Sequence, residues 1–289
     1  MTTTDNLSAT VALSDEAADT ASRASSWSAF RALLQRDAYV LAHNLKEFLP
    51  RTLIQPFLLV FVFSYVLPKI GLGIGSNPAA GPDAAAAYSA SLIAGVVASV
   101  ILFQGIQAVA LPLVQEFGYT REIEDRVLAP LPVELVAVEK IVGGALQCMI
   151  AALLVFPIAK LVPATPVHLH IHWLVLLTLL PLACIMASSL GLTFGTIFDP
   201  RTVPMLFGVI VVPITFLGCI YYPWKALAAI RWLQILSLAN PLVYISDGFR
   251  AALTDVPHMS LWAIYPAMIA LTTFLAWNGI RGFKKRVIA

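Results

Sequence analysis

Apolar residues along this chain gather into six long stretches, and short polar segments separate them. The hydrocarbon core of a bilayer is about 30 Å thick, and about 20 helical residues are needed to cross it. The pattern therefore predicts an all-α integral membrane protein with six transmembrane helices. The predicted spans are 52–68, 88–114, 141–162, 173–198, 204–222 and 260–279.

The segment before the first span has a different periodicity. Between Trp27 and Phe48, apolar residues recur three, four or seven positions apart, while polar residues fall on another side. An aromatic apolar face opposite a partly basic face is typical of a helix that lies in the headgroup plane of a membrane. We expect an amphipathic interface helix here, although an ordinary surface helix packed on protein shares the pattern. The residues assigned to it are Trp27, Phe30, Arg31, Leu34 and Leu41.

A third pattern follows the fifth span. The apolar segments Lys225–Leu238 and Leu242–Leu253 are too short to cross a bilayer, and Asn240-Pro241 separates them. Together they predict a re-entrant hairpin at 225–253 that dips into the outer leaflet.

The predicted hairpin carries two arginines, Arg231 and Arg250. We expect both near the headgroups, where a guanidinium can bind the phosphate or carboxylate of a passing amphiphile. Simple snorkelling anchors are the alternative. The site residues assigned to the hairpin are Arg231, Asn240, Pro241 and Arg250.

Composition agrees with a chain dissolved in lipid. Of its 289 residues, 59% are apolar and 12% are charged, whereas soluble domains carry about 25% charged residues. A net charge of +2 is too small to indicate nucleic acid. No glycine is followed by Lys-Ser or Lys-Thr, so the chain lacks a phosphate-binding loop and we expect it to hold no cofactor.

The position of the charges predicts the topology. Thirteen of the eighteen Lys and Arg lie in the N-terminal region, in 115–140, in 199–203 and in 281–286. Cytosolic loops carry the excess of such residues, so we expect a multi-pass plasma (inner) membrane protein with both termini cytosolic. Residues 1–24 are rich in Thr, Ser, Ala and acidic residues and predict a disordered cytosolic tail before the membrane domain at 25–289.

Few residues in the spans offer catalytic or metal-binding chemistry. No carboxylate pair or Cys/His couple converges at one membrane depth, and no acid lies deep in a span, which disfavours a membrane enzyme and an ion-coupled carrier. His168, His170 and His172 alternate in an outer loop without a nearby acid or cysteine, so an interfacial loop is expected there and no metal site. Gly191 and Gly195 form a small-xxx-small pair, a motif of close helix packing that is also common by chance.

The segment 116–132 is the most highly charged connection between two spans. Six of the eleven residues from Glu116 to Arg126 are charged, with both signs present, and the segment ends in Leu-Ala-Pro-Leu-Pro. This segment, the preceding amphipathic helix, the six spans, and Asn240-Pro241-Leu242 followed by Arg250 resemble the permease subunit of type-2 ABC exporters. The resemblance covers about residues 25–289.

Within that family the chain is most similar to actinobacterial permeases of the daunorubicin and multidrug exporter kind. The residues that carry this similarity are Glu124-Asp125-Arg126 followed by Pro130-Leu131-Pro132. Members of the family move lipophilic drugs, lipids and lipid-linked glycans, and the motif does not separate these cargoes.

The resemblance implies a function for the charged segment. In such permeases it contains a coupling helix that binds a separate ABC nucleotide-binding subunit, where ATP and Mg are held, and the amphipathic helix braces the same subunit. A second permease chain, identical or different, completes the pathway, and membrane lipids surround both. The residues that the resemblance assigns to coupling are Glu116, Tyr119, Arg121, Glu122, Ile123, Glu124, Asp125 and Arg126.

Aromatic residues toward the outer half of the fifth span suit a lipophilic cargo and are possible pathway residues. They are Phe207, Phe216, Tyr221 and Tyr222. The sequence thus predicts a non-catalytic permease subunit of an ATP-driven exporter. A non-transport membrane scaffold or assembly factor and an integral membrane enzyme remain the alternatives.

Overall fold

The computed structural model describes residues 26–70, 81–120, 132–162, 169–198 and 207–288. Within these ranges the chain contains helices and no strands. Helices long and apolar enough to cross a membrane occupy Leu45–Val66, Ala86–Gly118, Val133–Leu161, Trp173–Ile197 and Leu261–Val287. The prediction of a multi-pass all-α membrane protein is therefore confirmed. The fifth predicted span, at 204–222, stays a prediction because the described part of it begins only at residue 207.

The helices follow one another in a simple order. Residues 26–43 form the first helix. The elements after it are α2 (Leu45–Phe61), η1 (Val62–Val66), α3 (Leu67–Lys69), α4 (Gly81–Gln115), η3 (Glu116–Thr120), α6 (Val133–Leu161), α7 (Trp173–Ile197), η4 (Phe207–Val211), α9 (Val212–Phe216), η5 (Trp224–Ala229), α10 (Arg231–Ser237), α11 (Pro241–Leu253) and α12 (Leu261–Ile288).

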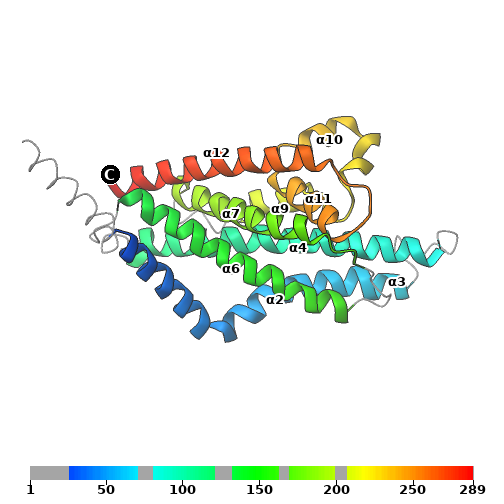
Figure 1. Cartoon of the computed structure of the whole chain (residues 1–289), viewed down its shortest axis with the longest axis horizontal. Coiled ribbons are helices and arrows are strands. Elements are labelled where there is room, and N and C mark those ends of the chain that lie inside the picture. The colour runs from blue at the N-terminus through cyan, green and yellow to red at the C-terminus, as the bar shows by residue number, and fades with distance from the viewer. Residues whose placement is uncertain (1–25, 71–80, 121–131, 163–168, 199–206, 289) are drawn as a thin grey trace, which may run out of the picture.

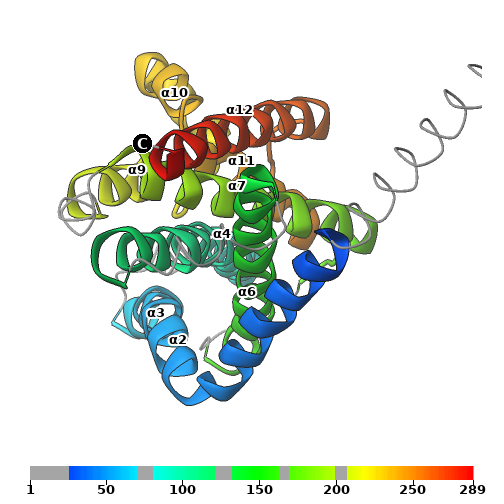
Figure 2. The same ribbon diagram turned by 90° about the vertical axis from the view of Figure 1, so that its left-hand side faces the viewer.

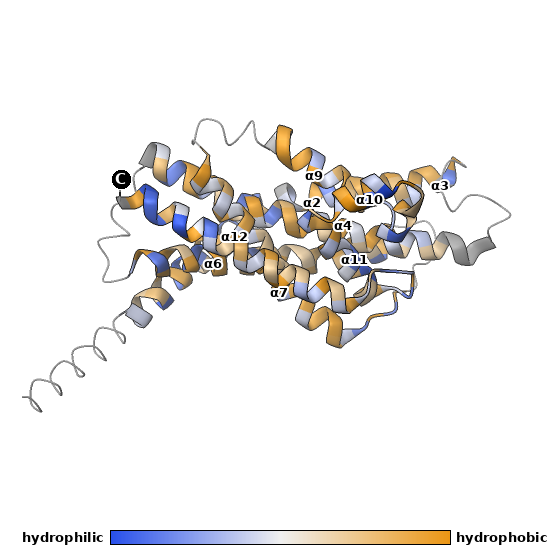
Figure 3. Cartoon of the chain, turned by 90° about the horizontal axis from the view of Figure 1, so that it is seen from above, coloured by the Kyte–Doolittle hydropathy of each residue, from blue (hydrophilic) through white to orange (hydrophobic). Residues whose placement is uncertain are grey.

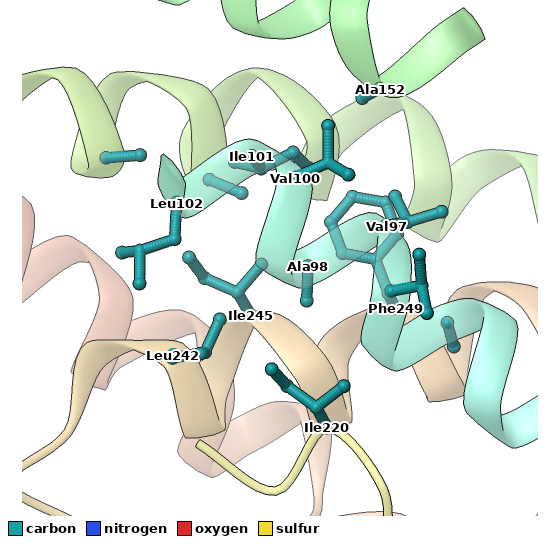
Figure 4. Close-up of a cluster of buried hydrophobic side chains, with 14 of the residues drawn as sticks. Val97, Ala98, Val100, Ile101, Leu102, Ala152, Ile220, Leu242, Ile245 and Phe249 are labelled. Carbon is teal, nitrogen blue, oxygen red and sulfur yellow. The ribbon is translucent and has the colours of Figure 1, made fainter. Parts of the chain in front are cut away.

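Helix α4 lies at the centre of the bundle, and α2, α6, α7 and α11 pack around it (Figures 1 and 2). Its residues from Ala90 to Val114 are mostly buried because apolar side chains occur on all of its sides. Figure 4 shows Val97 and Ile101 of α4 among side chains of α11, among them Ile245 and Phe249. This contact holds the short helix α11 against the middle of the bundle.

The pair Gly191 and Gly195 lies at a close helix contact, as the small-xxx-small motif predicts. A Cβ atom added to Gly191 would lie 2.7 Å from the carbonyl oxygen of Gly105 in α4. One added to Gly195 would lie 3.0 Å from Leu113 of the same helix. These glycines let α7 approach α4 more closely than larger residues would allow.

The first helix is shorter than the sequence pattern indicates. It ends at His43, Asn44 forms a turn, and Leu45 begins α2. The predicted end at Phe48 is therefore wrong, because apolar spacing continues through a corner where the helix axis changes direction. Figure 1 shows the two helices meeting at this corner.

The region after residue 206 also differs from its prediction. Helix α9 ends at Phe216, and the chain turns before Tyr222 with Cys219 at a positive φ of 54°. The apolar run to Tyr222 therefore includes a turn that hydropathy does not detect. The first half of the predicted hairpin is divided at Ile230 into η5 and α10, and α11 follows Asn240 as expected.

Different elements lie at the two ends of the bundle. The start of the 26–43 helix and the C-terminal end of α12 lie at one end, and α3 and α10 lie at the other (Figure 1). Figure 3 shows hydrophilic residues along the last turns of α12 and apolar residues along the middle of the bundle. We call the end that holds the α12 terminus the charged end.

Candidate functional site

The predicted coupling segment begins and ends at the charged end. Helix α4 continues through η3 to Thr120, and α6 starts at Val133, so both sides of the 121–131 connection are anchored in long helices. The ammonium group of Lys140 donates a hydrogen bond to the Glu116 carboxylate at 2.6 Å, and both side chains are buried. A buried ion pair of this geometry fixes the end of α4 against the start of α6.

The C-terminal residues of α12 complete this end. The Phe283 ring meets the Phe117 ring edge to face, with centroids 5.8 Å apart. The Arg286 guanidinium lies 5.3 Å from the centroid of Phe117 and donates a hydrogen bond to the Gly195 carbonyl of α7 at 2.9 Å. Lys284 and Glu134 form an ion pair between α12 and α6. The ends of four helices thus meet around the base of the charged segment.

The structure places only part of the predicted coupling set. Glu116 lies in the buried pair with Lys140, and Tyr119 lies in η3. The others, Arg121, Glu122, Ile123, Glu124, Asp125 and Arg126, fall outside the described residues. Lys140 was not among the predicted residues, because the predicted third span began one residue after it. The sequence feature that could have identified Lys140 is its position as a lysine one helical turn after Val136, at the start of an apolar run.

The interface helix packs on the same end through part of its predicted apolar face. Phe30 packs against the cluster around Phe283, and Leu34 and Leu41 are half-buried. Trp27 stacks on Phe30 but keeps 64% of its surface exposed, and Arg31 is exposed. The helix therefore contacts the bundle and also presents an aromatic residue outward.

The segment predicted to form the outer hairpin contains a buried charged centre. Arg250 has no exposed surface, and its guanidinium lies 2.8 Å from the Asp247 carboxylate, which is also fully buried. The Nε atom of Arg250 donates a hydrogen bond to the Ser91 hydroxyl of α4 at 2.8 Å. Its other donors bond the carbonyls of Cys219 and Ile220.

These contacts correct the expectation that Arg250 lies at the headgroups. The side chain is surrounded by α4 and α11 and by the turn after α9, where its donors find acceptors inside the protein. Asp247, which the sequence analysis missed, also accepts hydrogen bonds from the backbone N–H groups of Trp224 and Met259. The available signal was an Asp and an Arg three positions apart in an otherwise apolar helix.

Two of the remaining hairpin residues, Asn240 and Pro241, begin helix α11. Asn240 caps α11, because its side-chain oxygen accepts the Leu242 N–H at 2.9 Å and its amide donates to the Ile214 carbonyl at 2.6 Å. Pro241 occupies the first position of that helix, where its missing N–H costs nothing. Arg231 is exposed at the start of α10, as expected for either of its proposed roles.

Three of the four possible pathway residues lie at the end of α9 or in the turn after it. Phe216 keeps 63% of its surface exposed at the end of α9. Tyr221 instead faces Phe63 of η1, with ring centroids 5.0 Å apart, and the Tyr222 hydroxyl bonds the Phe216 carbonyl. Phe207 begins η4, and its side chain is outside the described part of the chain.

The histidines of the predicted outer loop have an acidic neighbour that the sequence does not reveal. His170 and His172 lie 3.2 and 3.4 Å from the carboxylate of Asp255, a residue far along the chain. Among the described residues, no group of three or more His, Cys, Asp or Glu is arranged to hold a metal ion. His168 falls outside those residues.

Comparison with known proteins decides the family. Residues 28–254 match the family described as ABC-2 type transporter. The chain belongs to the ABC-2 type transporter family. The matched range begins in the 26–43 helix and ends just after α11, so it includes the charged segment and the Asp247–Arg250 centre. This membership confirms the resemblance to type-2 ABC permeases and places the chain with transporters rather than with catalytic enzymes.

Curated relatives of this ABC-2 family chain agree with the family assignment. It is 27% identical over 169 residues to the inner membrane transport permease YadH of Escherichia coli strain K12. The protein of the same name from Shigella flexneri matches equally. The alignments cover 56% of this chain and 63% of each relative.

Proposed function

We propose that this chain is the transmembrane permease subunit of an ATP-driven ABC exporter in the plasma (inner) membrane. Membership of the ABC-2 type transporter family, matched over residues 28–254, is the observation that carries the proposal. The relatives are named as inner membrane transport permeases, which supports the same location and role. ATP and Mg would be bound by a separate nucleotide-binding subunit.

The charged end is the proposed contact with that subunit. Its segment 116–132 carries charges of both signs and is held between α4 and α6 by the buried Glu116–Lys140 pair. Because the segment is anchored to a long helix on each side, a force that the partner exerts on it would move α4 and α6 together. Mixed charges around apolar residues favour a specific partner of complementary charge.

A second permease chain would complete the pathway. Exposed apolar side chains on α2 and α9, among them Ile54, Phe57 and Phe216, offer surfaces for that chain and for lipid. The cargo that fits such surfaces is lipophilic, and a lipophilic drug, a lipid and a lipid-linked glycan are the proposed classes.

The test is purification of the chain from its native membrane in mild detergent, with mass spectrometry of bound proteins and an assay of ATP hydrolysis. We expect a nucleotide-binding subunit to copurify with ATPase activity. Recovery of this chain without an ATPase, even after crosslinking, would instead favour the scaffold or the enzyme.

Variants of the charged segment test the contact itself. Glu122→Ala, Glu124→Ala and the double variant are expected to lower stimulation of the partner ATPase, while membrane levels of the chain stay normal. Asp255→Ala is the control, because that carboxylate lies beside His172 at the start of α7, whereas the end of α7 lies at the charged end. Unchanged stimulation in all three segment variants would place the contact elsewhere.

A further inference from the structure

Two cysteines lie where three of the spanning helices pack together. Cys148 of α6 has no exposed surface, and Cys184 of α7 is 1% exposed. The Cys148 thiol donates a hydrogen bond to the Ile101 carbonyl of α4 at 3.0 Å. Figure 4 shows Ile101 in the same cluster as Ala152, which lies one turn beyond Cys148 on α6. All three residues of this junction are near the middle of their helices, so the junction is far from both ends of the bundle.

The packing of α6 against α7 brings the two thiols together. These helices run in opposite directions (Figure 1). Gly144 of α6 faces Ser188 of α7, because a Cβ atom added to the glycine would lie 3.0 Å from the Ser188 hydroxyl. Cys148 lies four residues after Gly144, and Cys184 lies four residues before its partner serine. Both cysteines therefore belong to the same contact one turn further along, and their thiols interact directly.

The third cysteine lies apart from this pair. Cys219 is in the turn after α9, and the next residue, Ile220, packs on Gly95 of α4, where an added Cβ atom would overlap the Ile220 carbonyl. Gly95 precedes Ile101 by six residues, which corresponds to about 9 Å along a helix. The chain thus holds one facing pair of thiols in its core and one buried thiol well outside that pair.

Neighbouring thiols are ligands for soft metal ions. In the part of the chain that the structure describes, no third His, Cys, Asp or Glu joins the pair to complete a larger set of ligands. The pair therefore suits an ion that needs only two ligands, such as the mercuric ion, rather than zinc, which takes four. A divalent ion with two thiolates is also neutral, so the complex places no uncompensated charge among apolar side chains.

We propose that Cys148 and Cys184 form a binding site for one thiophilic divalent metal ion, the mercuric ion being the example, at the junction of α4, α6 and α7. Mercuric chloride reaches the site as a neutral molecule. Two mercury–sulfur bonds form and two mercury–chlorine bonds break, while the two thiol protons leave with the two chloride ions and no oxidation state changes. The bound ion joins α6 to α7 and holds them at a fixed distance.

The test uses the purified full chain in mild detergent, with mercuric chloride as the probe and native mass spectrometry as the readout. We expect one chloride-free ion per chain with the loss of two protons, which is the composition of a complex with two thiolates. An adduct with a single thiol keeps one chloride and loses one proton. The complex should also raise Tm, by about 5–10 °C at a hundredfold excess over Kd. Zinc chloride should produce neither effect.

Variants assign the ion to the pair. Cys148→Ser keeps a donor for the Ile101 carbonyl, and Cys184→Ala removes the other thiol with a small change in volume. Each should lose the chloride-free complex. Cys219→Ala is the matched control, because it removes the buried thiol outside the pair, and it should keep the complex. Melting without the ion shows which variants are folded, and either of the first two is sufficient because the complex needs both thiols.

Three results would overturn the proposal. They are a wild-type chain that carries only adducts with chloride, a chloride-free complex that survives in Cys148→Ser or Cys184→Ala, and loss of that complex in Cys219→Ala. Since the assay contains no ATP and no partner subunit, its result does not depend on the proposed transport function.

Discussion

The Asp247–Arg250 pair shows how one residue can join distant parts of this chain. Arg250 bonds Ser91 of α4 and the carbonyls of the turn at Cys219 and Ile220, while Asp247 accepts the Met259 N–H before α12. Desolvating two charges is costly, and these hydrogen bonds offset that cost. The pair therefore positions α11 in the bundle rather than binding an amphiphile at the surface.

Removing one partner of this pair should be severe. Arg250→Ala leaves the Asp247 carboxylate buried without its cation, and we expect a loss of about 3–5 kcal/mol of stability. Thermal unfolding of the purified chain in detergent measures it. Arg231→Ala is the control, since that arginine is exposed at the start of α10 and surface changes usually stay within about 0.5 kcal/mol. Equal melting temperatures for the two variants would contradict the structural role.

At the scale of elements, the closeness of two helices depends on glycines, which have no side chain, as much as on the side chains that pack between them. Gly191 faces the backbone of Gly105, so α7 and α4 touch nearly backbone to backbone. The central position of α4 follows from such contacts, since it packs on four other helices. Any Cβ at this point has to push α7 away from the centre.

The corresponding prediction compares two glycines. Gly191→Ala should destabilise the protein by about 1–3 kcal/mol, because the added carbon would lie 2.7 Å from a backbone oxygen. Gly208→Ala in η4 meets nothing within 4 Å. It should be neutral or slightly stabilising, because alanine favours helices over glycine by up to about 1 kcal/mol. The melting temperatures of the two variants in detergent show which is less stable. A lower melting temperature for Gly208→Ala than for Gly191→Ala would refute the close contact.

At the scale of the whole molecule, charge separates the two ends of the bundle. The charged end holds the last turn of α12 with Lys285 and Arg286, and the 26–43 helix starts beside it. Cytosolic ends of membrane proteins carry this excess of basic residues. We therefore predict that the charged end faces the cytosol, where a nucleotide-binding subunit could reach it.

Cysteine labelling tests this orientation. The three native cysteines, Cys148, Cys184 and Cys219, are buried, so background labelling of these residues should be low. Ser260→Cys, exposed before α12, should react with a membrane-impermeant maleimide in intact cells. Lys285→Cys, exposed at the charged end, should react only after the membrane is opened. The reverse pattern would invert the topology.

Much of this architecture could be predicted from the sequence, because a bilayer demands long apolar helices whatever their neighbours are. Five of the predicted spans fall on helices of the structure that could cross a membrane, and none extends more than two residues beyond its helix. Asn240-Pro241 was also readable as the start of a helix, since an N-cap and a first-position proline act locally. The turn before Tyr222 and the corner at Asn44 were missed, since apolar runs continue through both.

By itself, then, the sequence determined the class of protein, its helices and its family, since these depend on hydropathy, local propensity and motifs. The tertiary structure decided which charged residues are buried and which residues they pair with. Glu116 with Lys140, and Asp247 with Arg250 and Ser91, are paired across turns or between helices. It also brought Asp37 of the 26–43 helix beside Gly143 of α6. Such contacts follow from how helices cross, and no spacing along one chain records where they meet.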